Sequence, residues 1–256
     1  MDLNIIHNED CLETLKRLPD GCIDLMIQDL PYNTTACAFE YDMKPFLENL
    51  WEQWLRVGKE NCCYLFTALE PFRTDLILSN RKLFRYDLVW EKNVGSNFHH
   101  AGKMPIKIHE HILVFYRKLP TYNKQYYPAP KYKRHVTKET TGRTVIVKNR
   151  TSYEDEIGRR LQKSVYCVGA DSDRFNTQGD QQHLHPTQKP IELFRKLIET
   201  YSNENEIVFD GFMGSGTTAI ASIKSKRNFL GAELDKKYFD GATERINNVM
   251  AQTSLF

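Results

Sequence analysis

The amino-acid sequence predicts an α/β protein whose strands form a largely parallel sheet. Short apolar runs of strand length alternate with amphipathic stretches of helical period at both ends of the chain, which is typical of layered α/β folds. The chain has 256 residues, of which 41% are hydrophobic and 27% charged. It can therefore bury one large core, or one core and a smaller lobe, and general disorder is not expected. No apolar run is long enough to span a bilayer.

Strands are expected where apolar and β-prone residues run together over a short stretch. Such runs occupy residues 4–7, 23–28, 62–66, 84–90, 111–117, 206–210 and 228–233. Helices are expected where apolar residues recur on one helical side, as Leu12, Leu15 and Leu18 do. Further apolar helix faces are expected at Phe46, Leu50, Trp54 and Val57, at Ile191, Phe194, Ile198 and Tyr201 after a start at Thr187, at residues 217–224, and in the chain after residue 233.

The middle of the chain, from about residue 118 to 180, lacks this periodicity and resembles an insertion into a domain built from both chain ends. Between Arg117 and Lys163, 13 Lys/Arg residues stand against 4 Asp/Glu, a local balance of +9, whereas the whole chain carries +2. Tyrosines interleave with these cations, at Tyr122, Tyr126, Tyr127, Tyr132 and Tyr153. Two interpretations remain open: a solvated loop region, or a surface whose cations meet phosphates and whose rings meet unpaired bases.

One tetrapeptide directly follows a predicted buried strand. Residues 23–28 run into Asp29-Leu30-Pro31-Tyr32, which places a carboxylate beside a stiff backbone and an aromatic ring. An acid at a strand end can simply cap a turn. It can also present an ionised carboxylate to a ligand, because ligands of parallel sheets bind at the carboxyl ends of strands.

A second stretch, residues 207–222, predicts a strand, a glycine-rich turn and a helix. Its glycines, Gly211, Gly214 and Gly216, allow backbone N–H groups to approach a ligand at a helix N-terminus. Residues 214–219 match G-x-G-x-x-A, a pattern of nucleotide-binding turns that is weak by itself. The basic residue of a phosphate-binding P-loop is missing.

Three acids are expected at strand ends: Asp29, Asp210 and Glu233. A ligand that carries a ribose and a positive charge, but no phosphate, suits such a site better than a dinucleotide does. S-adenosylmethionine has these properties. A nicotinamide oxidoreductase remains an alternative, although it would leave residues 29–32 and the basic insertion unexplained.

Together these motifs resemble the β class of amino-group DNA methyltransferases. Asp29-Leu30-Pro31-Tyr32 is similar to the catalytic D-P-P-Y of that class, residues 210–218 to its cofactor motif D-P-F-x-G-S-G-T-T, and residues 185–190 to the motif H-P-T-x-K-P that precedes it. The catalytic motif comes first and the cofactor motif last, with a variable region between them. The resemblance implies a Rossmann-like, S-adenosylmethionine-dependent methyltransferase fold with circularly permuted motif order.

The resemblance covers residues 1–116 and 183–256, which would form one discontinuous catalytic and cofactor-binding domain. Residues 117–182 would form the inserted target-recognition region. The residues that would then bind S-adenosylmethionine are Asp10, Cys11, Thr187, Lys189, Asp210, Phe212, Gly214, Gly216, Thr217 and Glu233. Helix capping explains Asp10 and Thr187 equally well. Leu30 and Gly211 depart from the motifs by replacing prolines, and a looser turn is expected at Gly211.

The resemblance also implies a reaction. Asp29 and the carbonyl of Leu30 would each accept one N–H of an exocyclic amine, so that the nitrogen lone pair turns towards the methyl group. Tyr32 would stack on the target base, which is flipped out of double-stranded DNA. Adenine N6 is the expected target, with cytosine N4 as the alternative and a catalytically silent DNA-binding regulator as a third interpretation.

The remaining expectations concern metals, partners and compartment. Two histidine pairs could be read as metal ligands, His109 and His111 around Glu110, and His183 and His185. No metal site is expected, because both pairs lack a third partner at a suitable spacing. The six cysteines form no C-x-x-C pair, which favours reduced thiols in a cytosol. The resemblance implies a bacterial cytoplasmic protein, or a phage protein that acts in the bacterial host. A homodimer and a cognate restriction endonuclease are possible partners that the resemblance leaves open.

Overall fold

The computed structural model describes residues 1–31, 43–127, 159–168 and 188–253. The chain divides into two compact units, residues 1–123 together with 164–256, and residues 124–163. None of the described helices is long and apolar enough to cross a membrane.

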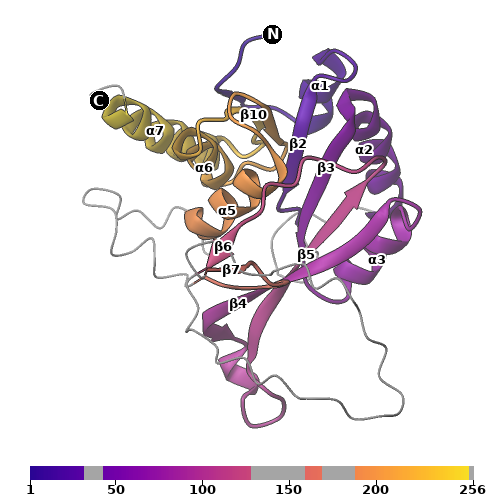
Figure 1. The fold of residues 1–256 in the computed structure, drawn as a ribbon, viewed down its shortest axis with the longest axis vertical. Coiled ribbons are helices and arrows are strands. Elements are labelled where there is room, and N and C mark those ends of the chain that lie inside the picture. The colour runs from indigo at the N-terminus through magenta and orange to yellow at the C-terminus, as the bar shows by residue number, and fades with distance from the viewer. Residues whose placement is uncertain (32–42, 128–158, 169–187, 254–256) are drawn as a thin grey trace, which may run out of the picture. The chain divides into compact units, whose positions relative to one another are not determined.

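The larger unit contains an eight-stranded sheet (Figure 1). The strand order is β1 (Ile5–His7), β10 (Asn228–Ala232), β9 (Ile207–Asp210), β2 (Ile23–Gln28), β3 (Gly58–Ala68), β5 (Lys107–Tyr116), β4 (Phe84–Ser96) and β8 (Val165–Cys167). Neighbouring strands are parallel except where β5 pairs with β3 and β4. The sheet is therefore largely parallel, and the predicted fold class is confirmed.

Helices cover both faces of this sheet (Figure 1). One face packs against α1 (Cys11–Arg17), α2 (Met43–Val57) and α3 (Phe72–Ser79), and the other against α5 (Ile191–Tyr201), α6 (Thr217–Lys224) and α7 (Lys236–Thr253). A 3₁₀ turn, η1 (Phe98–His100), lies between β4 and β5. The result is a three-layer arrangement in which the central strands are buried on both faces.

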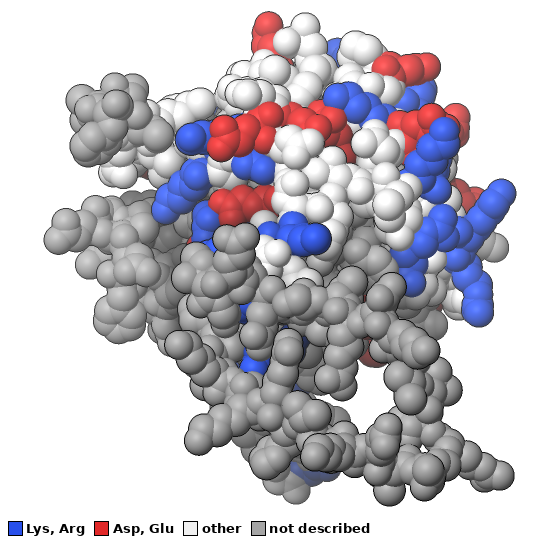
Figure 2. Space-filling view, viewed as in Figure 1, with Lys and Arg blue, Asp and Glu red and all other residues white. Residues whose placement is uncertain are grey.

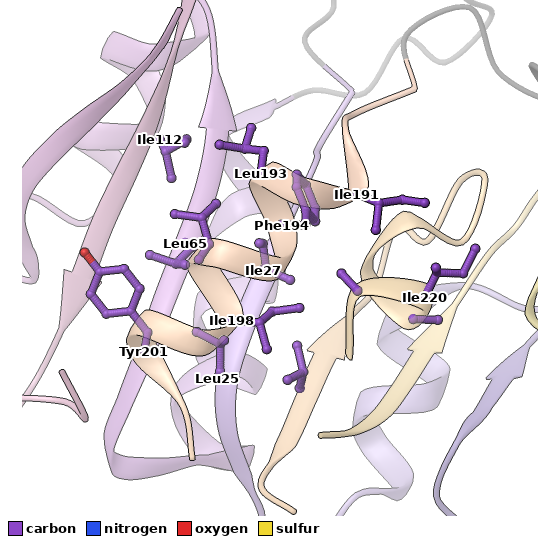
Figure 3. Packing of buried hydrophobic residues seen from close by; sticks show 14 of the residues in the cluster. Leu25, Ile27, Leu65, Ile112, Ile191, Leu193, Phe194, Ile198, Tyr201 and Ile220 are labelled. Atoms are coloured by element: carbon purple, nitrogen blue, oxygen red, sulfur yellow. The ribbon is translucent and has the colours of Figure 1, made fainter. Parts of the chain in front are cut away.

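Strand β2 shows how the sequence produces these layers. Leu25 and Ile27 face the α5 side, whereas Met26 between them faces the α2 side, because successive side chains of a strand point to opposite faces. Figure 3 shows Leu25 and Ile27 beneath Phe194 and Ile198 of α5. All of these side chains are fully or almost fully buried, and each contributes roughly 1.5–3 kcal/mol of transfer free energy.

Helix α5 begins at Ile191, with Pro190 at its N-cap position, and not at Thr187 as expected from the sequence. The reason is local: Lys189 precedes a proline, and that position disfavours helical backbone. Thr187 lies outside the described residues.

The weakly patterned middle contributes to both units. Strand β8 lies within residues 117–182, which the sequence analysis assigned to the insertion, yet it pairs with β4 in the main sheet. In the smaller unit, β6 (Tyr126–Tyr127) pairs antiparallel with β7 (Arg160–Leu161). Such short strands have no detectable period, so the sequence could not reveal them.

The order of the strands places a strand from the N-terminal part of the chain beside a strand from the C-terminal part at the centre of the sheet. Strand β2, from the N-terminal part, pairs with β9, from the C-terminal part. Helix α6, which follows β9, and helix α2, the first described helix after β2, pack on opposite faces. The connections thus diverge at this point, where open α/β sheets bind ligands beyond the carboxyl ends of their strands.

Candidate active site

The carboxyl ends of β2 and β9 are held together by a buried glutamine. Leu25 is level with Val208, and Met26 with Phe209. The Gln28 side chain, which is fully buried, donates through Nε2 to the Phe209 carbonyl at 3.0 Å and accepts through Oε1 from the Gly211 N–H at 2.9 Å. The residue after Gln28 and the turn after β9 therefore lie at the same edge of the sheet.

Asp29 lies at this edge, and two side chains form hydrogen bonds with its carboxylate. Lys189 Nζ contacts both carboxylate oxygens, Oδ1 at 2.9 Å and Oδ2 at 2.8 Å. The Thr67 hydroxyl, at the end of β3, donates to Oδ1. The Asp29 side chain keeps 26% of its surface exposed, whereas that of Lys189 keeps only 7%. The carboxylate is thus oriented by the protein but still accessible.

The ion pair continues into the interior of the protein. Lys189 Nζ lies 3.6 Å from Glu110 Oε2 on β5, and Lys92 Nζ on β4 lies 2.8 Å from Glu110 Oε1. These side chains are nearly buried, with 10% exposure for Glu110 and 12% for Lys92. Charges of opposite sign therefore alternate from Lys92 through Glu110 and Lys189 to Asp29.

Asp210 ends β9 as a buried acid without a cation beside it in the described part of the chain. Its Oδ1 accepts from the Phe212 N–H at 2.9 Å, and its Oδ2 accepts from the Thr218 hydroxyl. Burial raises the pKa of the Asp210 carboxyl to about 7, more than these two hydrogen bonds lower it. The carboxylates of Asp29 and Glu233 contribute to this rise.

The glycine turn after Asp210 leads into α6. Gly214 and Gly216 have φ values of 54° and 81°, in the left-handed region that glycine adopts without strain. Glu233, just beyond β10, accepts from the Gly214 N–H through Oε2 at 2.7 Å and from the Asp235 N–H through Oε1 at 2.9 Å. Burial is the main cause that raises the pKa of Glu233 above its usual value.

The start of α1 packs against this turn. Asp10 is the N-cap, and its Oδ1 accepts from the Leu12 N–H at 2.8 Å. A Cβ atom added to Gly211 would lie 2.9 Å from the Cys11 Cβ. The departure at Gly211 from the proline of the motif is therefore explained by close packing, since only glycine leaves room for Cys11 here.

Other predicted site residues lie around the same edge. Leu30 is buried, and the Thr217 hydroxyl donates to the Lys189 carbonyl at 3.3 Å. The Phe212 ring meets the Phe46 ring edge to face, with 6.1 Å between centroids. Pro31 is partly buried, and Tyr32 lies outside the described residues.

Of the two histidine pairs considered as metal ligands, the pair on β5 has another environment, and the other lies outside the described residues. His111 Nδ1 lies 2.8 Å from Asp87 Oδ2, which also accepts from Arg73 at 3.1 Å. Glu110, between the two histidines in sequence, belongs to the charge chain described above. Among the described residues, no group of three or more His, Cys, Asp or Glu side chains could hold a metal ion.

Comparison with known proteins identifies the family. A family model described as DNA methylase, of the N6 and N4 methyltransferases, matches residues 23–244. The chain belongs to this DNA methyltransferase family. The chain is 30% identical to the type II methyltransferase M.BglII of Bacillus subtilis, over 99% of this chain and 72% of that protein. It is 29% identical to the DNA adenine methyltransferase YhdJ of Escherichia coli K12, over 95% of this chain and 82% of that protein.

The fold agrees with this assignment. The crystal structure of the M1.HpyAVI–SAM complex matches with a TM-score of 0.63 and 23% identity, over 94% of this chain and 98% of that one. The methyltransferase uses S-adenosylmethionine as its cofactor and acts on DNA.

The residues at the ends of β9 and β10 fit this cofactor. Asp210 and Glu233 are carboxylates whose described hydrogen-bond partners are neutral, so a cationic ligand beside them is electrostatically favoured. The Glu233 oxygens each have further acceptor capacity for ribose hydroxyls. The turn through Gly214 and Gly216 brings the backbone to the N-terminus of α6 without side chains in the way.

Sequence reasoning missed several residues whose side chains build the site, namely Gln28, Thr67, Lys92 and Glu110. One signal was available for Gln28, because a long polar side chain at the end of a strand buried on both faces needs partners there. Lys92 and Glu110 have no such signal. Lys92 lies two residues after Trp90 and Glu110 lies between two histidines, and only the antiparallel pairing of β4 with β5 brings them together.

Proposed function

We propose that this methyltransferase methylates the exocyclic N6 amine of adenine in double-stranded DNA at a specific sequence. The observation that carries the proposal is the position of Asp29, whose carboxylate is fixed by Lys189 and Thr67 beside the turn after Asp210. A carboxylate at this edge can accept an N–H from a base presented to the cofactor half of the site.

The mechanism assigns separate tasks to neighbouring residues. When bound, S-adenosylmethionine supplies an electrophilic methyl group on a cationic sulfonium. Asp29 and the Leu30 carbonyl each accept one N–H of the amine, which draws the nitrogen towards tetrahedral geometry and frees its lone pair. Burial of the Leu30 side chain anchors the backbone that carries this carbonyl. The proton that the amine loses passes to Asp29 or to solvent.

The base must leave the double helix before Asp29 can reach it. Flipping costs a few kcal/mol, which the hydrogen bonds to Asp29 and Leu30 and stacking on an aromatic ring offset. We assign the stacking to Tyr32, which lies outside the described residues. No covalent bond between protein and base is needed.

The choice of adenine over cytosine is supported by the aspartate at position 29 and by the name of the relative YhdJ, a DNA adenine methyltransferase. The family itself includes N6 and N4 enzymes. DNA should therefore be incubated with methyl-labelled cofactor, hydrolysed to nucleosides and separated. N6-methyladenine is the expected product, N4-methylcytosine would overturn the choice of base, and the absence of label would overturn the catalytic proposal.

We assign DNA contact to the basic insertion. In the smaller unit the Arg159 guanidinium lies 5.5 Å from the Tyr126 ring centroid, and Lys163 Nζ lies 5.8 Å from that of Tyr127. Cations that alternate with rings can meet phosphates and unstacked bases. On the face of the protein shown in Figure 2, by contrast, cationic and anionic side chains of the described residues stand next to one another.

The salt dependence of DNA binding tests this assignment. Replacing Arg159, Arg160 and Lys163 by Gln should reduce the slope of log K against log salt by roughly 0.9 for each phosphate that the protein no longer neutralises. Glu13→Gln and Lys16→Gln together, which remove an exposed ion pair of the larger unit outside the basic insertion, serve as the control. An unchanged slope in the triple variant would place the DNA-binding surface elsewhere.

The enzyme's compartment and partners remain proposals as well. The type II methyltransferase M.BglII among the relatives supports a restriction-linked role, with action on DNA in a bacterial cytoplasm. A cognate endonuclease and a homodimer are expectations from the family resemblance.

A further inference from the structure

Behind Lys189, the buried charges of Glu110 and Lys92 have no part in the reaction described so far. A lysine ammonium has three N–H donors. Lys189 directs two of them to the Asp29 oxygens and lies 3.6 Å from Glu110 Oε2 with the same nitrogen. These contacts occupy the ammonium inside the protein, which argues against the cofactor-binding role that the family resemblance implies for Lys189.

Glu110 is the second unusual member of the chain. Its Oε2 is buried and has no hydrogen-bond partner among the described residues, so the ammonium of Lys189 is the group that compensates its charge on this side. Its Oε1 contacts Lys92, and Lys92 also lies over the Trp90 ring. Removing a single member would leave a buried charge uncompensated, because buried ion pairs depend strongly on both partners.

We propose that Lys189 is a positioning residue that fixes the plane of the Asp29 carboxylate, and that Glu110, held by Lys92, fixes Lys189 in turn. The proposal rests on the function of Asp29 proposed above. A carboxylate bound by one donor can rotate about its side-chain bonds, whereas contacts from Lys189 to both oxygens and from Thr67 to one of them determine its orientation. The amine N–H then meets an acceptor already aligned for the reaction.

The experiment compares Lys189→Met, Glu110→Gln and the double variant with the unchanged enzyme. The rate of methyl transfer to a short duplex is measured in single turnovers, and cofactor affinity is measured by calorimetry. Glu192→Gln is the matched control, because Glu192 is a carboxylate on α5 that pairs with Arg195 and has no role in the proposed mechanism. Thermal unfolding of each variant checks that the fold is intact.

The expected result is a separation of rate from affinity. Lys189→Met should lower the transfer rate by about 100-fold, and Glu110→Gln by about 10-fold, since small displacements of a catalytic group have effects of this size. Cofactor affinity should stay within about threefold in both, because neither residue binds the cofactor in this proposal. In the Lys189→Met background, Glu110→Gln should change the rate less than about twofold, since Glu110 acts through Lys189.

Other outcomes would overturn the proposal. An unchanged rate in Lys189→Met would show that Lys189 does not position Asp29. If cofactor affinity also fell tenfold or more, Lys189 would instead be assigned to the cofactor. Additive effects in the double variant would show that Glu110 acts independently. If Lys189→Met unfolds more than about 5 °C below the unchanged enzyme, the test relies on Glu110→Gln, which preserves side-chain shape. Its transfer rate should then fall while its cofactor affinity stays unchanged. Activity of Asp29→Ala would instead overturn the proposed function itself.

Discussion

The two halves of the candidate site treat their carboxylates in opposite ways. At the end of β2, Asp29 is paired with the ammonium of Lys189, and the positive charge is part of the protein. At the ends of β9 and β10, Asp210 and Glu233 receive only backbone N–H groups and a hydroxyl among the described residues. Burial accordingly raises the pKa of both acids.

This difference indicates that the half with Asp210 and Glu233 favours a cationic ligand. Neutral hydrogen bonds do not repay the loss of water around Asp210 and Glu233, so these carboxylates are most stable when a positive ligand lies near them. S-adenosylmethionine carries such a charge. The Asp29 half, already neutralised by Lys189, can accept an uncharged base instead.

The largest expected effect comes from removing the paired carboxylate. Asp29→Ala should lower methyl transfer by at least about 10³-fold, because both a positioned acceptor and a proton acceptor are lost. Cofactor affinity should change little, since Asp210 and Glu233 remain. Activity is measured with labelled cofactor and affinity by calorimetry. Asp20→Ala, at an exposed ion pair with Arg56, is the control, and an active Asp29→Ala enzyme would refute the assignment.

The next effect concerns the boundary between the halves. Gly211→Pro restores the proline of the family motif, yet it should destabilise this protein by about 2–4 kcal/mol. The ring would meet the Cys11 Cβ, and the N–H that satisfies the buried Gln28 Oε1 would be lost. Gly211→Ala keeps the N–H and should lose less. Chemical denaturation of both variants measures the difference, and a proline variant of unchanged stability would contradict this account.

The sequence predicted the layers of the fold because helices and strands with a buried face leave a periodic signal. Strand β2 and helix α6 were predicted with the bounds that the structure shows. Helix α3 was missed, since few of its residues, such as Phe72 and Leu76, are buried and no clear apolar face appears. Strand β8 was missed because three residues are too few for a period.

The site was only partly predictable for a related reason. Asp29, Asp210 and Glu233 are visible in the sequence because each lies at or just beyond the end of a strand, and parallel strands of one sheet end at the same edge. The partners of these acids come from register and packing. Thr67 faces Asp29 because Gln28 pairs with Phe66, and sequence spacing alone does not contain that register.

A smaller effect should appear in the pH dependence of cofactor binding. A cation near Asp210 favours its ionised form, whose pKa burial otherwise raises to about 7. Affinity for S-adenosylmethionine should therefore increase by up to about tenfold between pH 6 and pH 8, with proton release on binding. The demethylated product, a neutral sulfide, should depend on pH much less. Calorimetry in buffers of different ionisation enthalpy measures the affinity and proton release of both ligands. Equal pH dependence for the two would contradict the view that Asp210 and Glu233 favour a cationic ligand.

The smallest effect should be seen in the protein without ligand. Because the pKa of Asp210 is higher in the folded state, the folded protein binds more protons than the unfolded chain between about pH 4 and pH 7. The free energy of unfolding should therefore decrease as the pH rises through this window and stay level above it. Asp210→Asn cannot titrate and keeps an acceptor for the Phe212 N–H. The free energy of unfolding of Asp210→Asn, relative to that of the unchanged protein, should thus increase from pH 5 to pH 8 by on the order of 1 kcal/mol or more. Urea unfolding at the two pH values measures this difference. A constant difference between the proteins would mean that Asp210 is already compensated, and the contrast between the two halves would then lose its electrostatic basis.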